Sequence, residues 1–261
     1  RAVPGSLRGI DFREAVLDEP PSAVLIPEPS DRCLILYTSG STGTPKGVVH
    51  CQQALSQAVF NMMFTGMLTM TVEGGLRDLR GGATQEKALL NVPLFHATGL
   101  LGSFVLPLVT GQGIVMISKW DAQEALRLIE SERVTLFSSV PSLVKDLLTQ
   151  PNLDEFDITS LQRVSSGGAA MPSDLPGIID AQIDQAYASG GYGLTETLAV
   201  GSQAAGAVFD AKPTSAGVQS PIMHVRCTAT DGTVLSDGEP GEIEMKGVAC
   251  TLGYWNKPEA D

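Results

Sequence analysis

The sequence predicts an α/β fold: a mostly parallel sheet with flanking helices, followed by a small antiparallel β subdomain. Between residues 88 and 188, short apolar runs of strand length alternate with helical patterns, as in sheets built from strand–helix–strand units. After about residue 217, polar–apolar alternation and Asp-Gly turns replace that pattern, which is typical of antiparallel hairpins. The chain has 261 residues and 43% hydrophobic residues, enough for a large core.

The first 30 residues are rich in proline and are predicted to be an irregular lead-in to a body at 31–212. In order, the body is expected to hold a buried strand at 33–37, a helix at 50–67, an exposed loop at 73–85, a strand at 88–92, a buried helix at 100–109, a strand at 114–117, a helix at 121–132 capped by Asp121, a strand at 134–137, a helix at 142–148, and strands at 163–166 and 185–188. The β-rich subdomain, 213–261, is expected to pair strands at 224–230 and 242–246.

The charge balance argues against a nucleic-acid partner. Acidic residues outnumber basic ones by 29 to 17, which gives a formal net charge of -12, whereas a nucleic-acid surface needs a basic face. A small anionic substrate remains compatible with this charge, because a few local donors can capture it.

The cysteines and the apolar runs indicate a cytoplasmic protein. The four cysteines, Cys33, Cys51, Cys227 and Cys250, lie far apart and lack the spacing of a metal site, so they are predicted to be reduced, buried thiols. No apolar run reaches the roughly 20 residues that span a bilayer, and the first residues do not resemble a secretion signal. The composition leaves an oligomer open.

The most informative segment is a glycine- and hydroxyl-rich loop at residues 38–47, Thr-Ser-Gly-Ser-Thr-Gly-Thr-Pro-Lys-Gly, directly after the first predicted strand. Its glycines let backbone N–H groups approach a phosphate, its hydroxyls donate, and Lys46 adds a positive charge. A Thr-Pro pair separates Gly43 from Lys46, so the loop does not fit the spacing of P-loop NTPases.

Residues 37–48 resemble the signature loop of the adenylate-forming superfamily, which comprises acyl-CoA synthetases, peptide-synthetase adenylation domains and beetle luciferases. Three further segments are similar to motifs of that superfamily in the same order. They are 93–99 (Pro-Leu-Phe-His-Ala-Thr-Gly), 165–172 (Ser-Ser-Gly-Gly-Ala-Ala-Met-Pro) and 191–197 (Gly-Tyr-Gly-Leu-Thr-Glu-Thr). The resemblance implies that a carboxylate attacks the α-phosphate of ATP, and that a thiol then takes the acyl group from the acyl-adenylate.

The resemblance also implies the roles of individual residues. Lys46, Thr195 and Glu196 are expected to be catalytic, with Glu196 holding Mg²⁺, a cation that prefers oxygen ligands. The residues expected to bind ATP are Thr38, Ser39, Gly40, Ser41, Thr42, Gly43, Lys46, Gly167, Gly168, Ala169, Gly191, Tyr192, Gly193 and Thr195. Within this set, Gly167 and Gly168 let backbone approach the adenine, and the Tyr192 ring stacks on it.

His96 is expected to lie beside the substrate carboxylate. Amino-acid-activating relatives place an aspartate there, so histidine favours a plain organic acid, with a fatty acid as the expected substrate. A capping or core role for His96 is the alternative. The methionines after the loop, Met62, Met63, Met67 and Met70, fit either an adaptable apolar pocket or core packing, and packing is preferred.

The last segment, including 253–258 (Gly-Tyr-Trp-Asn-Lys-Pro), resembles the run that leads to a ribose-binding aspartate in relatives. Tyr254 and Trp255 are predicted to be packing residues. That aspartate and the lysine of a mobile C-terminal domain are expected to lie beyond Asp261, so the chain is interpreted as a nearly inert fragment.

The sequence therefore predicts the core of an acyl-CoA synthetase that uses ATP, Mg²⁺ and CoA. Two alternatives stay open: a ligase that loads acyl groups onto a carrier protein, and a nucleotide-binding module without catalysis. The presence of Lys46, Thr195 and Glu196 in the resembling motifs disfavours the second, because a module without catalysis need not keep its magnesium carboxylate.

Overall fold

A seven-stranded sheet forms the centre of the chain in the computed structural model, which describes residues 26–38, 44–72, 85–183 and 186–260. The strands lie in the order β4-β3-β5-β6-β7-β8-β9. Their bounds are β3 Lys87–Leu90, β4 Gly113–Met116, β5 Leu136–Ser139, β6 Arg163–Ser166, β7 Tyr187–Tyr192, β8 Ser202–Ala205 and β9 Val218–Gln219. The five strands β3 to β7 run parallel to one another, and β8 is antiparallel to both of its neighbours, β7 and β9. The predicted α/β fold with a mostly parallel sheet is confirmed.

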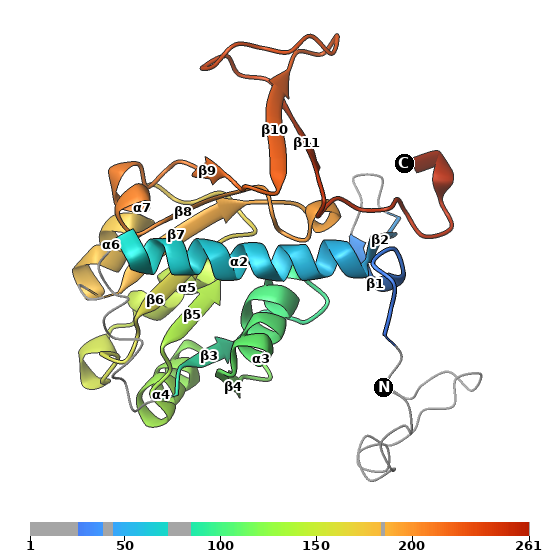
Figure 1. The fold of residues 1–261 in the computed structure, drawn as a ribbon. Helices are drawn as coiled ribbons and strands as arrows, with labels where there is room; N and C mark the ends of the chain where they lie inside the picture. The colour runs from blue at the N-terminus through green and yellow to red at the C-terminus, as the bar shows by residue number, and fades with distance from the viewer. Residues whose placement is uncertain (1–25, 39–43, 73–84, 184–185, 261) are drawn as a thin grey trace, which may run out of the picture.

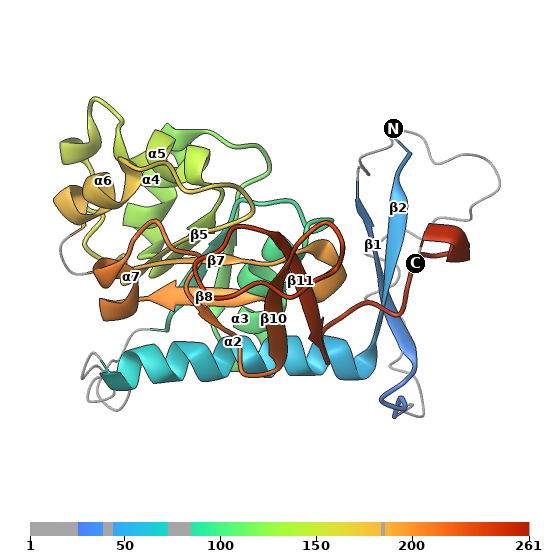
Figure 2. The same cartoon turned by 90° about the horizontal axis from the view of Figure 1, so that it is seen from above.

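Helices cover both faces of this sheet (Figure 2). Helices α4 (Ala122–Glu132), α5 (Pro141–Leu148) and α6 (Leu175–Gln182) lie on one face, and the long helix α2 (Gln52–Val72) lies on the other. The first face is a continuous apolar core, in which Leu89, Phe137 and Val164 from neighbouring strands are fully buried. Their alternation with Ala88, Leu136 and Arg163 is the two-residue period of a strand, which sends the other side chains toward α2.

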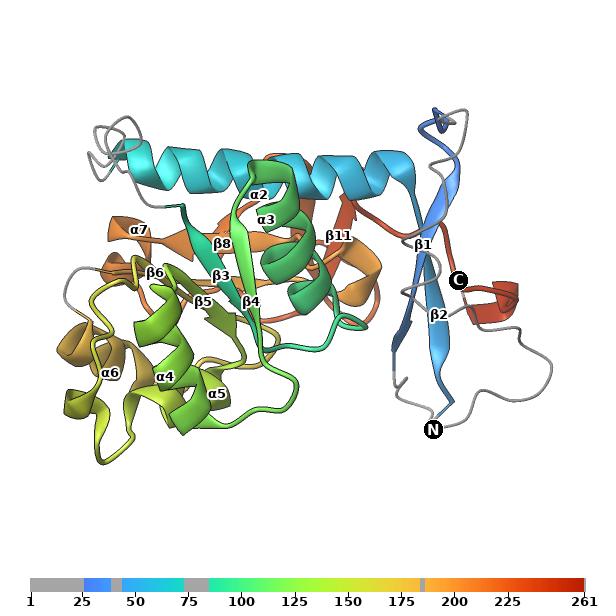
Figure 3. The ribbon, with the colours of Figure 1, turned by 90° about the horizontal axis from the view of Figure 1, so that it is seen from below.

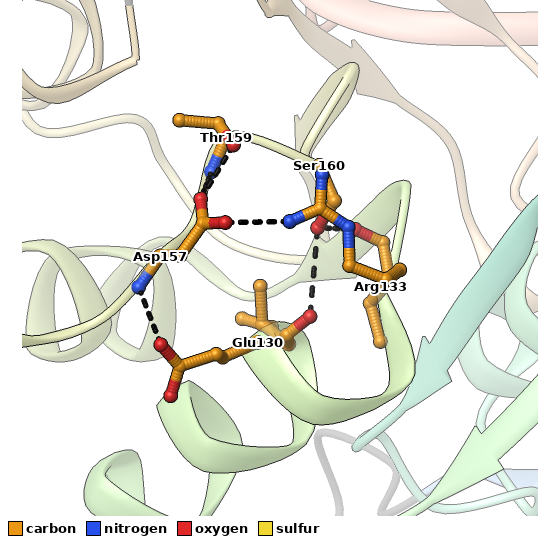
Figure 4. Close-up of polar contacts among 7 residues, drawn as sticks. Glu130, Arg133, Asp157, Thr159 and Ser160 are labelled. Carbon is orange, nitrogen blue, oxygen red and sulfur yellow. Dashed lines mark hydrogen bonds and ion pairs between the residues drawn. The ribbon is translucent and has the colours of Figure 1, made fainter.

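Local signals in the sequence fix the ends of α4. The Asp121 carboxylate accepts a hydrogen bond from the Glu124 N–H at 2.9 Å, so the predicted cap is confirmed. The helix ends at Arg133, which has a left-handed φ of 56°. Figure 4 shows Arg133 paired with Asp157 at 2.6 Å, while Glu130 accepts from the Asp157 N–H at 3.0 Å. This polar cluster attaches the end of α4 to the segment before β6.

The glycine-rich loop joins the two strands of a separate hairpin, and this corrects the expected helix start. Strands β1 (Arg32–Thr38) and β2 (Lys46–Cys51) pair antiparallel, and α2 begins only at Gln52. Residues 50 and 51 extend the strand because the ladder with β1 continues to Arg32. In β1 only Leu36 is fully buried, so the prediction of a buried strand was also wrong. Figure 3 shows the hairpin beside the sheet, at one end of α2.

The helix predicted at 100–109 is two elements. Residues Thr98–Val105 form a wide π-type helix (η2), which continues into the short helix α3, Leu106–Thr110. Leu101 is fully buried, but Leu108 and Val109 are exposed, so the expectation that the whole segment is buried was wrong. The π-type turn is uncommon and is often found at functional sites.

The predicted antiparallel hairpin is present. Strands β10 (Met223–Thr228) and β11 (Glu242–Gly247) pair antiparallel and project from the body (Figure 1). Strands β8 and β9 and helices α6 and α7 (Ala207–Ala211) had no counterpart in the sequence reading. Because β9 pairs with β8, the main sheet extends beyond residue 212, where the body was expected to end.

Three short 3₁₀ helices complete the described part: η3 (Leu153–Glu155), η4 (Thr195–Thr197) and η5 (Pro258–Ala260). All four cysteines are free thiols, of which Cys51 is buried and the other three are half-buried. None of the described helices is long and apolar enough to cross a bilayer.

Candidate functional site

Two of the predicted motifs meet at the carboxyl edge of the parallel strands. Strand β6 runs into Gly167 and Gly168, and its parallel neighbour β7 ends at Tyr192, just before Gly193 and Thr195. Loops at this edge of an α/β sheet are the usual location of ligands. The sheet therefore brings together segments that lie about 25 residues apart, as the motifs predicted.

The glycines of these turns have different structural reasons. A Cβ at Gly167 would meet no atom within 4 Å, so this backbone faces open space that a ligand can approach. Gly168 has a left-handed φ of 78°. A Cβ at Gly193 would lie 2.3 Å from the Ala199 backbone carbon, so Gly193 is required by packing. Only the first turn offers its backbone as the motif implies.

A cavity of about 240 Å³ lies against the sheet on the side of α2. Gly167, Gly168, Gly191 and Gly193 are among the residues that line it, together with Ser138, Ser165 and Ser189 of the sheet, Thr98 and Gly102 of η2, and Asn61 and Met62 of α2. The wall is mostly small side chains and backbone, which leaves room for a flat or extended group.

The methionines after the loop were predicted to line an apolar pocket or to pack in the core, and both roles are observed. Met62 lines the cavity, and Met62 and Met63 also pack against a second apolar cluster that includes Ala58 and Leu101. Met67 is exposed. A larger groove, about 530 Å³, lies between α5 and α6 and is lined by none of the predicted site residues.

Tyr254 connects the two charged residues of the predicted site. Its hydroxyl donates to Glu196 Oε1 at 2.8 Å. The Lys46 ammonium lies 4.8 Å from the centre of the Tyr254 ring, within the range of a cation–π contact. Tyr254, which was predicted to be a packing residue rather than a ligand, thus also contacts both charged residues of the predicted site. Trp255 has a different contact, with the Arg32 guanidinium 5.7 Å from its ring centre.

Backbone contacts hold the segment around Glu196. Nε2 of His50 donates to the Thr195 carbonyl at 2.9 Å, and the Thr251 N–H donates to the Glu196 carbonyl at 2.7 Å. His50 is fully buried. Burial lowers its pKa, and the bond to the Thr195 carbonyl and the charge of Glu196 only oppose this effect. A neutral His50 fits a ring with one N–H donor toward a carbonyl.

The phosphate loop is described only at its two ends. Thr38 and Lys46 face each other as the last pair of the β1–β2 ladder. The predicted residues Ser39, Gly40, Ser41, Thr42 and Gly43 lie outside the described residues. Lys46 thus enters the site from a hairpin, whereas in a P-loop NTPase the lysine begins a helix.

The remaining predicted residues lie around this edge, but not in the cavity wall. His96 is exposed, its ring contacts Phe95 with centroids 4.7 Å apart, and it precedes η2. Tyr192 ends β7 and is 37% exposed, so its ring is accessible for stacking. Ala169 is exposed after Gly168. The roles assigned to these residues stay predictions.

Glu196 fits the way in which proteins hold Mg²⁺ with a nucleotide. Among the described residues, no group of three or more His, Cys, Asp or Glu side chains could enclose a metal ion. Mg²⁺ in nucleotide sites commonly takes one or two carboxylates together with phosphate oxygens and water. The half-buried Glu196 has Oε1 bonded to Tyr254, a neutral donor that leaves the carboxylate its negative charge, which suits that mode.

Three functional candidates escaped the sequence reading: Tyr254, His50 and Arg163. Arg163 lines the cavity and pairs with Glu86 at 2.7 Å. Only the position of His50 directly after Lys46-Gly-Val-Val, in the strand that leaves the loop, could have drawn attention to it. Tyr254 lies 58 residues from Glu196 in the sequence, and no local sequence pattern predicts their contact.

Comparison with known proteins gives a consistent picture. Residues 6–255 match the family described as AMP-binding enzyme. The chain is 36% identical over 249 residues to a feruloyl-CoA synthase of Amycolatopsis sp, covering 95% of this chain and 47% of that protein. It is 31% identical over 230 residues to a long-chain-fatty-acid–CoA ligase of Bacillus subtilis (strain 168), covering 88% of this chain and 39% of that protein.

Among solved structures, the N-terminal domain of FACL13 from Mycobacterium tuberculosis, bound to an inhibitor, superposes with a TM-score of 0.75 at 30% identity. That match covers 93% of this chain and 56% of the FACL13 domain. The chain spans about half the length of the curated relatives it matches.

Proposed function

Because the chain belongs to the AMP-binding enzyme family, we propose that the protein carrying it activates an organic acid with ATP and passes the acyl group to CoA. The supporting observation is the carboxyl edge of the sheet. There the Gly167–Gly168 turn lines a cavity, and Lys46 and Glu196 converge on one tyrosine. A pocket lined mostly by uncharged groups, beside a lysine and a carboxylate, suits an acid and a nucleotide that carries Mg²⁺.

In this proposal the acid occupies the cavity between the sheet and α2, and its carboxylate points toward the edge of β6 and β7. The backbone at Gly167 and Gly168 and the Tyr192 ring bind the adenine. Lys46 and the Thr195 hydroxyl bind phosphate oxygens, and the Lys46 charge stabilises the negative charge of the departing pyrophosphate. Glu196 would hold Mg²⁺, which supplies further neutralisation of phosphate charge.

The reaction forms a bond between a carboxylate oxygen and the α-phosphorus and breaks the bond from that phosphorus to pyrophosphate. The CoA thiol then replaces AMP on the acyl carbon. Positioning of the two reactants supplies much of such a rate. His96, where amino-acid-activating relatives have aspartate, supports a substrate without an ammonium group. Fatty acids and hydroxycinnamates are the two classes to compare.

The direct test is acid-dependent exchange between ATP and labelled pyrophosphate by the full-length protein, measured across a panel of fatty and aromatic acids. We expect exchange with at least one acid. Glu196→Gln should reduce it by about 100-fold or more, as loss of an electrostatic stabiliser does. Glu155→Gln, which changes an exposed carboxylate in η3, is the matched control and should leave exchange unchanged.

Exchange by Glu196→Gln at the rate of the control would refute the catalytic assignment. An absence of exchange with every acid, together with retained ATP binding, would favour the nucleotide-binding module. Offering CoA and an acyl carrier protein in parallel separates the two thiol acceptors.

A further inference from the structure

Tyr254 makes two contacts that no motif explains. Its hydroxyl donates to Glu196 Oε1 at 2.8 Å, and its ring lies 4.8 Å from the Lys46 ammonium. The two groups come from distant parts of the chain, η4 and the start of β2. A single side chain thus fixes the positions of a carboxylate and an ammonium that carry opposite charges.

The backbone around Tyr254 is held firmly against β2. The Val49 N–H donates to the Gly253 carbonyl at 3.0 Å, and the Trp255 N–H donates to the Gly47 carbonyl at 2.7 Å. Tyr254 also forms a bridge with Val48. The segment therefore adds a short third strand to the β1–β2 hairpin, on the side away from β1, and the tyrosine has a fixed distance to Lys46.

The same segment is tied to Glu196. The Thr251 N–H donates to the Glu196 carbonyl at 2.7 Å, so both the backbone and the side chain of Glu196 are bound by residues 251–254. The Tyr254 hydroxyl is a neutral donor. It orients the carboxylate without neutralising it, in contrast to a lysine or arginine partner.

We infer that Tyr254 is a positioning residue that holds Glu196 ready for a magnesium ion and Lys46 ready for phosphate, an inference that rests on the proposed function. Oε1 is held by the tyrosine, so the second oxygen of Glu196 is the one that would meet the metal. Partners that orient a metal-binding carboxylate strengthen metal binding. The ring holds Lys46 by cation–π attraction until a phosphate offers a full negative charge.

The test is calorimetric titration of the full-length protein with ATP, once with Mg²⁺ and once with EDTA. Tyr254→Phe removes the hydroxyl and keeps the ring. We expect it to weaken ATP binding by about 10-fold to 100-fold with Mg²⁺, and to leave binding in EDTA and the midpoint of thermal unfolding unchanged. Trp255→Phe is the matched control, because its neighbouring ring contacts Arg32, and it should change neither titration.

A second variant separates the ring from the hydroxyl. Tyr254→Leu removes both, so it should show the same loss with Mg²⁺ and an additional weakening in EDTA, where Lys46 is the cation that meets the phosphates. A Tyr254→Phe chain with the wild-type ratio of affinities in Mg²⁺ and EDTA would overturn the inference. Equal weakening in both, with a lower unfolding midpoint, would also overturn it and assign Tyr254 to packing.

Failure of the proposed function gives a different result. In that case the wild-type full-length protein itself shows no ATP binding that depends on Mg²⁺, before any variant is made.

Discussion

The two faces of the central sheet differ in their packing: one face is covered by a close-packed core, and the other borders a cavity. On the side of α4, α5 and α6, the strands contribute Leu89, Phe137 and Val164 to a large apolar core. On the side of α2, the same strands contribute Leu136, Ser138 and Ser165 to the wall of a cavity. Adjacent residues of one strand thus pack the core or line the cavity, because successive side chains point to opposite faces.

This difference predicts which substitutions in the strands destabilise the fold. On the packed face, close packing means that a missing atom leaves a void. On the cavity face, space is already present, so a smaller side chain enlarges a pocket that a ligand can use. Substitutions at neighbouring positions should therefore separate stability from binding.

The largest effect should come from Phe137→Ala. This ring is fully buried in the packed core, and its loss should lower the free energy of unfolding by about 3–5 kcal/mol. Leu136→Ala, one residue away on the cavity wall, should cost clearly less and should change which acid binds best. Urea unfolding of both variants measures the difference, and equal losses would remove the proposed distinction between the faces.

The next largest effect on stability is expected at one of the two glycine turns at the edge of the cavity. At Gly193 a Cβ would lie 2.3 Å from the Ala199 backbone, so Gly193→Ala should lower the free energy of unfolding by about 1–3 kcal/mol, the usual cost of overpacking. At Gly167 a Cβ meets nothing. Gly167→Ala should leave stability within about 0.5 kcal/mol and weaken ATP binding.

Thermal unfolding and ATP titration of the two glycine variants check this pair. A destabilised Gly167→Ala chain, or one with wild-type ATP affinity, would contradict the assignment of Gly167 to the ligand.

The smallest effect is a pH dependence expected from His50 of β2, outside the central sheet, which is fully buried. Burial lowers its pKa from the ordinary value of 6.5, so the unfolded chain binds a proton more readily than the folded chain. This contribution to stability is complete above pH 6.5 and is lost as the pH falls below that value.

His50→Gln should reduce the slope of stability against pH just below 6.5, relative to wild type. Urea unfolding at several pH values provides the measurement, and the Phe137→Ala chain, which changes no ionisable group, is the control. An unchanged slope in His50→Gln would show that other groups account for the pH dependence.

Part of the fold followed directly from the sequence. Strand β6 was predicted at its observed bounds, and α4 with its Asp121 cap was predicted to within one residue, because period and capping are local signals. The π-type turn at Thr98–Val105 and the strand β8 were not predicted. The π-type turn depends on how its segment packs against the rest of the protein, and β8 depends on pairing with β7. Neither interaction can be recognised from a short stretch of sequence.

The candidate site divides in the same way. The motifs placed Gly167, Tyr192 and Glu196 at one edge, since strands β6 and β7 are parallel neighbours. They could not show that His96 lies outside the cavity wall, because that depends on how the segment before η2 is folded.

The sequence by itself determined the alternating α/β pattern, the glycine- and hydroxyl-rich loop and the family to which the chain belongs. Residue types and spacings along the chain are sufficient for these. Only the tertiary structure decided that Tyr254 joins Glu196 to Lys46, and that His50 is buried against Thr195. Those contacts span 58 to 208 residues of sequence, and an interaction at such separation exists only after the hairpin, the sheet edge and the last segment have packed together.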